Sequence, residues 1–457
     1  MGRASPHSSG FPSGFPAGPS SESPHDAPPH DALTAAPADA DCPRTLRASA
    51  VVVSADDVRF DAEVELEEGR VVAVRGPVEV EPEARATVLA PGFVNAHAHL
   101  DLGAARGLPV GDGGFLGWVG EVLQCRASLS EQEIAEGARR SAERLLSTGT
   151  TTVLDIDATG EVAAMLQGSP LRLVALREVI DGSPEGRDGR TEEALAAARA
   201  AVARGEGERR ASGLSPHGVH TVGDALLSEV AALRGARPVA IHWAETPEET
   251  AWMLRGEGPF SAWLGPSPRT SGAARLEAAG LLDGALLVHG NCPSPGEVEA
   301  LAGRGVSVVH CPGSHAYFAR APFDLAAFQA AGVPVALGTD SWASNGDLDM
   351  RREVRLAREH LGLDGATAWR MATEAGARHA PWPHVTGRLG VGDAADLQRL
   401  RPVGWGGPAE GGAGGGNSGE GGSVEGGGAD PAALLDVLTA REPEVEAVWI
   451  QGERISL

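Results

Sequence analysis

The chain contains no lysine, so arginine supplies all 38 of its strongly basic side chains. This absence excludes a binuclear metal site that is bridged by a carboxylated lysine. The chain also lacks any run of about 18 apolar residues and any apolar segment near its N-terminus, so we expect neither a membrane span nor a signal peptide, and a cytoplasmic location. Cysteine is scarce. Cys42, Cys125, Cys292 and Cys311 show no CxxC spacing, which predicts reduced thiols rather than a disulfide framework.

Acidic side chains, 62 in all, outnumber the basic ones and give a net charge of −24. Nucleic acids and anionic membranes attract basic surfaces, so this balance argues against both as partners. Two segments are too poor in apolar residues to form a core. Residues 1–42 are rich in Ser, Pro, Gly and Ala, and residues 404–428 are mostly Gly, which predicts a disordered N-terminal extension and a flexible surface insertion.

A histidine pair, His97 and His99, follows an apolar run that begins near residue 88. Residues two apart on an extended strand project from the same face, so one strand end can hold a metal ion with both imidazoles. Further polar residues follow short apolar runs downstream. They are His217 in SPH, His242 and Glu245 in IHWAE, His289 in VHG and Asp340 in LGTDSWASN. This arrangement predicts one site that is built from the ends of several strands.

The apolar runs are too short for helices and are bounded by Gly, Pro or polar residues, so they predict buried parallel strands. They cover residues 171–176, 238–241, 285–288, 306–309 and 334–337. Helical patterns lie between them, the clearest over 130–146, where Ser130 and Glu133 form a capping box. This alternation predicts an α/β fold, a (β/α)8 TIM-type barrel with its site at the C-terminal strand ends. A doubly wound sheet is the alternative, but it would not gather ligands from so many strands around one point.

These motifs, together with PGFVNAHAHL at 91–100, resemble the amidohydrolase superfamily. They are most similar to its metal-dependent deaminase and chlorohydrolase branch. That branch holds the S-adenosylhomocysteine and methylthioadenosine deaminases, guanine deaminase, the triazine hydrolases and aminodeoxyfutalosine deaminases. The resemblance covers roughly residues 46–400 and the last strand. It implies a small composite β-sandwich formed by residues 43–89 and 385–457, with the barrel, residues 90–384, inserted between the two halves.

The resemblance also implies a metal site. Many two-metal amidohydrolases bridge their metals with a carboxylated lysine on the fourth strand, and here His217 occupies the corresponding position. One divalent ion bound by His97, His99, His242 and Asp340 is therefore expected. Three imidazoles and a carboxylate with an open coordination position suit zinc, and the same ligands also accept iron, manganese or cobalt.

Three residues receive catalytic roles from the same resemblance. Metal binding lowers the pKa of a bound water toward ~7, Asp340 accepts a proton from that water, and His289 orients it. Glu245 protonates the ring nitrogen beside the attacked carbon and passes the proton to departing ammonia, work that is typically worth ~10²–10⁴ in rate. The structural alternative for Glu245 is a carboxylate that stabilises the N-terminus of a helix, because TPEE follows it.

Substrate contacts are expected from His217, Trp118, His315, Tyr317 and Ser341. The alternatives are support from behind the site for His217, a buried structural hydroxyl for Tyr317, and core packing for Trp118. After His217 the chain departs from its relatives, which usually continue with proline and an aromatic residue. His315 lies in HCPGSHAYF at 310–318, where the family normally has asparagines at the two histidine positions.

The implied function is hydrolytic deamination of an amino-substituted heterocycle, with an adenine-type nucleoside such as 6-aminodeoxyfutalosine as the best candidate. Hydrolysis of a cyclic amide or of a triazine is the first alternative. A non-catalytic barrel that acts as a scaffold is the second, but its signature would be lost ligands, and none is lost here. The partner is then a small heterocyclic substrate, and a homodimer is compatible with the resemblance, since dimers are common in the family.

Overall fold

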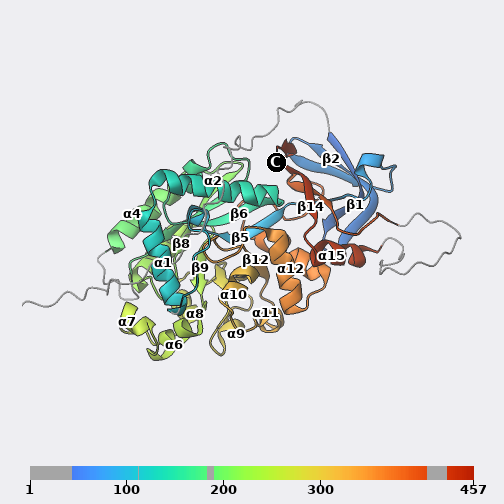
Figure 1. The fold of residues 1–457 in the computed structure, drawn as a ribbon. Coiled ribbons are helices and arrows are strands. Elements are labelled where there is room, and N and C mark those ends of the chain that lie inside the picture. The colour runs from blue at the N-terminus through green and yellow to red at the C-terminus, as the bar shows by residue number, and fades with distance from the viewer. Residues whose placement is uncertain (1–43, 112, 183–189, 409–429, 457) are drawn as a thin grey trace, which may run out of the picture. The chain divides into compact units, whose positions relative to one another are not determined.

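The computed structural model describes residues 44–111, 113–182, 190–408 and 430–456. All of them belong to one compact unit, Leu33–Leu457 (Figure 1). The expected disordered extension, residues 1–42, lies outside the described residues, and so do residues 409–428 of the expected Gly-rich insertion. In the described part of the chain, no helix is both long and apolar enough to span a membrane.

The N-terminal and C-terminal strands share one seven-stranded sheet, in the order β15-β14-β13-β4-β1-β2-β3 (Figure 1). These strands are β1 (Arg44–Ser54), β2 (Asp57–Glu67), β3 (Arg70–Arg75), β4 (Val88–Pro91), β13 (Leu397–Arg401), β14 (Glu444–Ile450) and β15 (Glu453–Ile455). Leu89 of β4 pairs in parallel with Val51 of β1 and antiparallel with Arg399 of β13. Because β4 bonds on both sides, the strands merge into one sheet, where we expected the two sheets of a β-sandwich.

Local sequence patterns explain individual elements. In β2 the alternate residues Ala62, Val64 and Leu66 are buried, which gives that strand one apolar face. The capping box predicted at the start of the helix over 130–146 is confirmed. The Glu133 N–H donates to Ser130 Oγ at 3.3 Å and the Ser130 N–H donates to Glu133 Oε2 at 2.8 Å, and α2 runs from Glu131 to Ser147.

Two four-stranded parallel sheets carry the candidate site, in the orders β5-β6-β7-β8 and β12-β11-β10-β9. Their strands are β5 (Phe93–Ala98), β6 (Thr150–Asp157), β7 (Arg172–Val179), β8 (Arg210–Pro216), β9 (Ala240–Trp243), β10 (Leu286–His289), β11 (Ser307–His310) and β12 (Val335–Leu337). Every residue of β5, β6 and β9 to β12 is buried, as expected for parallel strands that are covered on both faces.

The two parallel sheets meet at both of their edges through isolated bridges. Leu214 bridges Val239 and Gly218 bridges His242 between β8 and β9, and Ala98 bridges Asp340 between β5 and the residues after β12. The strands therefore follow one another in chain order, unlike a doubly wound sheet, where the order reverses. Since pairing at both junctions is limited to these bridges, the closed eight-stranded barrel stays a prediction.

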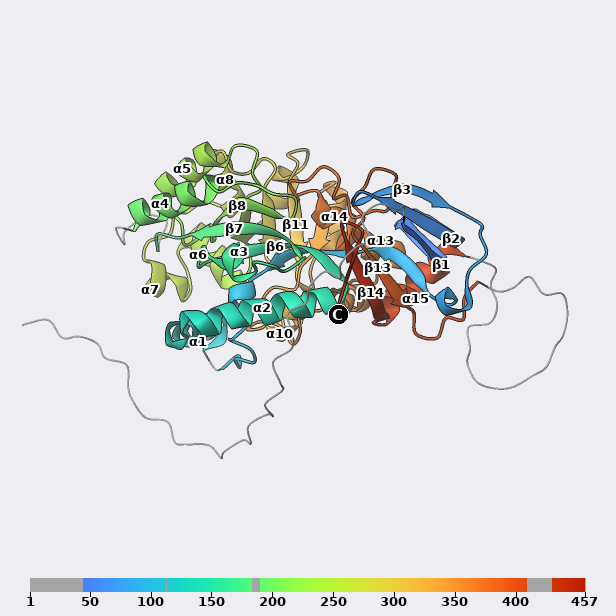
Figure 2. The same ribbon diagram turned by 90° about the horizontal axis from the view of Figure 1, so that it is seen from above.

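Helices lie between the parallel strands along the chain (Figures 1 and 2). They are α1 (Gly114–Ser128), α2, α3 (Val162–Met165), α4 (Thr191–Val202), α5 (Asp224–Arg234), α6 (Pro247–Arg255), α7 (Phe260–Leu264), α8 (Gly272–Ala279), α9 (Glu297–Ala300), α10 (Pro312–Tyr317) and α11 (Leu325–Ala330). After β12 come α12 (Met350–Leu361), α13 (Gly365–Ala372) and α14 (Glu374–Ala377), and α15 (Pro431–Ala440) lies between β13 and β14. Short 3₁₀ turns are η1 (Pro82–Ala84) and η2 (Leu100–Leu102). Helices α2, α4 and α5 pack against β6, β7 and β8 (Figure 2).

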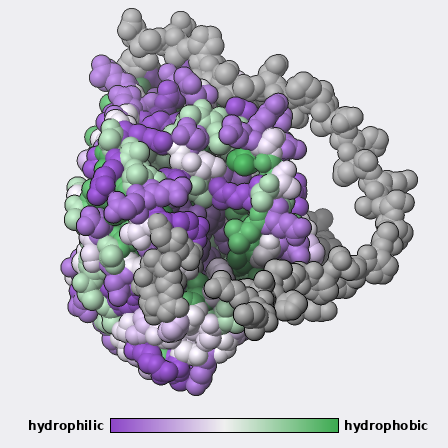
Figure 3. Space-filling model, turned by 90° about the vertical axis from the view of Figure 1, so that its left-hand side faces the viewer, coloured by the Kyte–Doolittle hydropathy of each residue, from purple (hydrophilic) through white to green (hydrophobic). Residues whose placement is uncertain are grey.

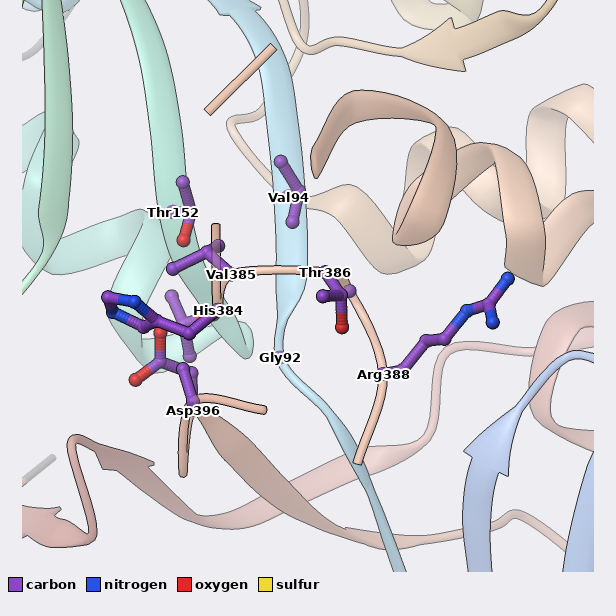
Figure 4. Close-up of a pocket in the computed structure, with 11 residues that line it drawn as sticks. Gly92, Val94, Thr152, His384, Val385, Thr386, Arg388 and Asp396 are labelled. Carbon is purple, nitrogen blue, oxygen red and sulfur yellow. The ribbon is translucent and has the colours of Figure 1, made fainter. Parts of the chain in front are cut away.

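A buried ion pair ties the start of β7 to the segment before β13. Arg172 and Asp396, whose side chains are 0% and 7% exposed, form the pair, and Asp396 Oδ1 also accepts a hydrogen bond from the Gln451 N–H at 2.9 Å. Asp396 borders a small cavity together with His384 (Figure 4). Asp396, at the edge of this cavity, thus connects the C-terminal segment to the parallel strands through Arg172.

Replacing Asp396 with asparagine is expected to lower the free energy of unfolding by about 3–5 kcal/mol, because the Arg172 charge stays buried without its counterion. Urea denaturation followed by circular dichroism measures the change. The matched control is Glu359→Gln, which removes the exposed partner of Arg355 at 2.9 Å and should cost under about 0.5 kcal/mol. Equal effects of the two substitutions would contradict a stabilising role of the buried pair.

Candidate active site

Histidines from different strands meet at the C-terminal ends of the parallel strands. The ring centroid of His97 lies 4.8 Å from that of His99, 5.2 Å from that of His242 and 5.6 Å from that of His289. Asp340 Oδ1 lies 3.5 Å from His97 Nε2 and 3.7 Å from His99 Nε2. The structure therefore brings together the four predicted metal ligands and also places His289 beside them.

A network of backbone and side-chain bonds holds the Asp340 loop against β5. The His97 carbonyl accepts hydrogen bonds from the N–H groups of Thr339 and Asp340, both at 3.1 Å. The Asn95 amide donates to Thr339 Oγ1 at 2.7 Å, and Ser314 Oγ donates to Asp340 Oδ2 at 2.8 Å. Asp340 adopts a φ of 58°, a left-handed conformation that costs about 1–3 kcal/mol in a residue other than glycine. The network overcomes that cost and aims the carboxylate at the histidines.

The imidazoles have the protonation and the free atoms that a cation needs. Neither ring nitrogen of buried His97 has a hydrogen-bond partner among the described residues. His242 Nδ1 lies 2.6 Å from the His217 carbonyl, to which it donates, so Nε2 is left as an acceptor. Burial holds the pKa of His242 well below its usual range and lowers the pKa of His99 to about 3. The rings of His99 and His242 are thus neutral near pH 7, with lone pairs available to a divalent ion.

The same atoms also lie close enough together for a single ion. In two overlapping sets, His97 with His99 and His242, and His97 with His289 and Asp340, the ligand atoms of each set all lie within 4.8 Å of one another. Buried orphaned nitrogens, neutral rings and this spacing together fit a divalent cation.

Glu245 follows β9 and its carboxylate turns toward His289. Oε2 lies 3.8 Å from His289 Nε2, and Oε1 accepts a hydrogen bond from Arg320 at 3.0 Å. Burial raises the pKa of Glu245 to about 8, although Arg320 opposes that shift. A carboxyl group with such a pKa holds its proton near neutrality and suits proton donation to a substrate.

Stabilisation of the N-terminus of α6 was the structural alternative for Glu245, but neighbouring residues provide that stabilisation. Thr246 caps α6 by accepting a hydrogen bond from the Glu249 N–H at 3.0 Å. The Glu249 carboxylate in turn accepts from the N–H groups of Ala244 at 3.1 Å and Glu245 at 2.8 Å. Because these groups satisfy the helix start and the turn before it, the Glu245 carboxylate stays in the cavity.

A cavity that is open to solvent lies over these residues, with about 860 Å³ of empty space when its mouth is included. Its lining includes the predicted residues His99, Trp118, His217, His242, Glu245, His289, Asp340 and Ser341. Apolar side chains from α1 cover another part of the wall, and Trp263 of α7 joins them. Leu123 and Trp263 are 58% and 48% exposed, so apolar groups reach the rim. On the face drawn in Figure 3, apolar side chains likewise border a hollow.

Three predicted substrate contacts line the cavity. His217 Nδ1 lies 2.6 Å from Thr221 Oγ1, and burial lowers the pKa of His217 to about 3, so its ring is neutral. Trp118 donates from Nε1 to the Ala343 carbonyl at 3.2 Å, which orients its ring. Ser341 Oγ lies 2.9 Å from Ser344 Oγ, so its hydroxyl is already engaged.

His315 and Tyr317 are not among the residues that line this cavity. His315 Nδ1 lies 3.1 Å from Asn291 Oδ1, and the Asn291 amide donates to the Glu245 carbonyl at 3.1 Å. His315 is thus linked to the Glu245 backbone through Asn291. The Tyr317 hydroxyl has no hydrogen-bond partner among the described residues, and its ring packs edge-on against Phe318. The residues that line the cavity therefore do not support the expected contact of His315 and Tyr317 with the substrate.

Several residues at the site were missed. Arg320 pairs with Glu245, and its guanidinium lies over the rings of Phe115 and Phe318, at 5.3 and 4.7 Å from their centroids. Glu178 and Arg126 line the cavity as well. Glu178 stands near the C-terminal end of β7, so the rule that located His217 and His242 could have found it. Arg320 offered no comparable signal, because its pairing depends on the packing of distant segments.

The sequence of the whole chain agrees with this geometry. The profile of the Amidohydrolase family matches residues 88–453, and the chain therefore belongs to the amidohydrolase family, as its motifs predicted. The chain is a hydrolase that acts on carbon–nitrogen bonds other than peptide bonds.

Two curated relatives and one solved structure illustrate the similarity. The chain is 35% identical over 333 residues to the 5-methylthioadenosine/S-adenosylhomocysteine deaminase of Halobacterium salinarum, covering 69% of this chain and 73% of that protein. It is 34% identical over 322 residues to the aminodeoxyfutalosine deaminase of Deinococcus radiodurans, covering 65% and 74%. The crystal structure of an adenosine deaminase from Xanthomonas campestris with bound zinc has a TM-score of 0.69 at 27% identity, covering 90% of this chain and 92% of that one.

Proposed function

We propose that this protein hydrolytically deaminates an adenine-type nucleoside. The observation that carries the proposal is the placement of the Glu245 carboxyl 3.8 Å from His289 Nε2, in the cavity that also holds the histidine cluster and Asp340. Deamination needs a proton donor for the departing ammonia beside a site that activates water, and this cavity combines the two. The names of the relatives, which are deaminases of adenine nucleosides, support the same reaction.

One divalent ion, held by His97, His99, His242 and Asp340, is part of the proposal. A bound ion of this kind acidifies water and so supplies hydroxide at neutral pH. Zinc is the proposed metal because three imidazoles and one carboxylate suit it, and because a structural relative binds zinc. The absence of lysine from the chain removes the carboxylated bridge that a second metal ion would use.

The side chains divide the proton transfers between them. Asp340 accepts a proton from the attacking water as its oxygen bonds to the carbon that bears the amino group. His289 orients that water and stabilises the charge that develops on the oxygen. Glu245 donates its proton to the adjacent ring nitrogen, takes up the remaining proton of the attacking water and delivers it to the amino group, so that the carbon–nitrogen bond breaks and ammonia leaves. The proton held by Asp340 then returns to Glu245, which restores both carboxyl groups to their starting states. His217, neutral and at the wall of the cavity, is proposed to hydrogen-bond the base.

The finer substrate proposal is 6-aminodeoxyfutalosine, named in the aminodeoxyfutalosine deaminase to which the chain is 34% identical. The apolar wall supplied by α1 favours a nucleoside whose sugar carries an apolar or aromatic group. The cytoplasmic location, the homodimer and the exclusion of nucleic acid and membrane as partners stay predictions.

We also propose that the two parallel sheets close into a (β/α)8 barrel over residues 90–384. The isolated bridges at both junctions support closure, since they link β8 to β9 and β5 to the residues after β12. Residues 43–89 and 385–457 are proposed as the two halves of one β domain, supported by the pairing of β4 with β13.

Ammonia release tests the function. Protein of known metal content is incubated with adenosine, 5′-methylthioadenosine, S-adenosylhomocysteine, 6-aminodeoxyfutalosine, guanine, cytosine and a triazine. At least one adenine nucleoside is expected to be turned over with a kcat/KM of about 10⁴ M⁻¹ s⁻¹ or more. Ammonia from guanine or cytosine alone would redirect the proposal to a free base. Loss of another group from a triazine, or no ammonia despite bound metal, would favour hydrolysis other than deamination.

A further inference from the structure

Glu178 is a cavity-lining carboxylate that the proposed mechanism does not use. It is the penultimate residue of β7, and only part of its side chain remains exposed. Among the described residues, no hydrogen bond or ion pair engages its carboxylate. Burial and the nearby carboxylate of Asp101 raise the pKa of Glu178 to about 7. The carboxylate therefore lines the cavity without a hydrogen-bond donor from the described residues.

The two arginines whose charges act on Glu178 donate hydrogen bonds to other groups. Arg126 donates to Asp101 Oδ2 at 2.8 Å, and Arg177 donates to the Asp157 carbonyl at 3.1 Å. Their charges act on Glu178 through space, and neither guanidinium forms a direct pair with it. The two carboxylate oxygens therefore keep their capacity to accept hydrogen bonds from a ligand in the cavity.

The neighbourhood of Glu178 is otherwise suited to apolar groups. The side chains that α1 presents to the cavity are Phe115, Trp118, Val119, Val122, Leu123 and Arg126, and only the last is charged. In such a pocket, a few polar groups fix the orientation of the ligand and reject analogues that lack the matching group. Glu178 also comes from the sheet β5-β6-β7-β8, whereas His289 ends a strand of the other sheet and Glu245 and Asp340 follow strands of that sheet.

We propose that Glu178 is a specificity-determining residue that accepts hydrogen bonds from hydroxyl groups on the sugar of the substrate. The assignment rests on the proposed function, which places the amino group of the base beside Glu245 and His289. The sugar is then the part of the nucleoside that extends from the reacting end, and hydroxyl groups are the donors it offers. A carboxylate can accept from two of them at once, which compensates the desolvation of Glu178.

The test compares Glu178→Gln with wild type on the best nucleoside substrate and on analogues that lack one or both ring hydroxyls. Wild type is expected to prefer the fully hydroxylated substrate by about 10- to 100-fold in kcat/KM, as for a hydrogen bond to a charged group. Glu178→Gln should lose that preference, mostly through a higher KM, and should turn over the analogue without hydroxyls as wild type does. The matched control is Glu121→Gln on α1, which removes an exposed carboxylate outside the cavity lining and should stay within about twofold of wild type.

The outcomes separate the two proposals. Equal losses on hydroxylated and deoxygenated substrates would overturn the role of Glu178 and leave the deaminase intact. A lower melting temperature of Glu178→Gln with unchanged substrate preference would overturn it in favour of a structural role, since the carboxylate has no hydrogen-bond or ion-pair partner among the described residues whose loss would destabilise the fold. Absence of ammonia release by wild type from every nucleoside would overturn the proposed function and this assignment with it.

Discussion

Replacement of Glu245 by glutamine is expected to lower kcat for ammonia release by about 10²–10⁴-fold, with little change in bound metal. The amide has nearly the shape of the carboxyl group but cannot exchange a proton with the ring nitrogen or the leaving amino group. Glu245 touches His289 and Arg320 and lies outside the proposed ligand set, so the metal content should stay at about one equivalent. Steady-state ammonia release and elemental analysis of the same preparation measure both quantities.

Glu248, three residues further along the chain, provides the control for this substitution. It is exposed in the first turn of α6, so Glu248→Gln removes a carboxylate from the same segment without reaching the cavity. Activity within about twofold of wild type is expected for the control. If Glu245→Gln kept comparable activity, another group would have to be the proton donor. The placement of Glu245 near His289 would then no longer support the proposed function.

Loss of the metal ion is expected to lower activity by about 10³-fold or more, because no other group in the cavity acidifies water to a comparable degree. Substitution of His97 by glutamine should have this effect together with loss of bound metal. His97 is fully buried, and neither of its ring nitrogens has a hydrogen-bond partner in the described part of the chain, so a metal ion held between His97 and Asp340 accounts for their placement. Elemental analysis after dialysis, compared with wild type, gives the change in metal content.

A second histidine serves as the matched control. His360 lies exposed in the last turn of α12, and His360→Gln should leave both metal content and activity near wild type. Wild-type protein that has been stripped by a chelator should regain activity when zinc is added, and the His97 variant should not. Full activity of the chelated protein would contradict a metal-dependent mechanism.

One rule of sequence interpretation, that polar residues after buried strands gather at one site, accounts for much of what the structure brings together. From the sequence alone, this rule predicts that His217, His242, His289 and Asp340 are neighbours, because parallel strands end at the same edge of the sheet. Glu178 obeys the same rule, but it belongs to no metal-ligand motif and was passed over. Family motifs thus mark the residues at the reacting end, whereas Glu178 at the cavity wall lies in no such motif.

Features that depend on packing between distant segments could not be predicted from the sequence in this way. The segment after β5 gives no local sign that α1 will cover the cavity, since its place depends on contacts that appear only in the folded chain. The ion pair between Arg320 and Glu245 joins positions 75 residues apart. His315 was assigned to the substrate from a motif, whereas its hydrogen bond to Asn291 sets it behind Glu245.

The position of β4 has a consequence for how the protein folds. Because Leu89 pairs with both Val51 and Arg399, the strand is complete only when the far end of the chain has arrived. During synthesis, β1 to β4 emerge first and expose an open strand edge while the parallel sheets are still being made. Such edges attract other extended chains, and late, non-local pairing slows folding. Cleavage or early termination before β13 would leave that edge permanently open and the nascent protein prone to aggregation.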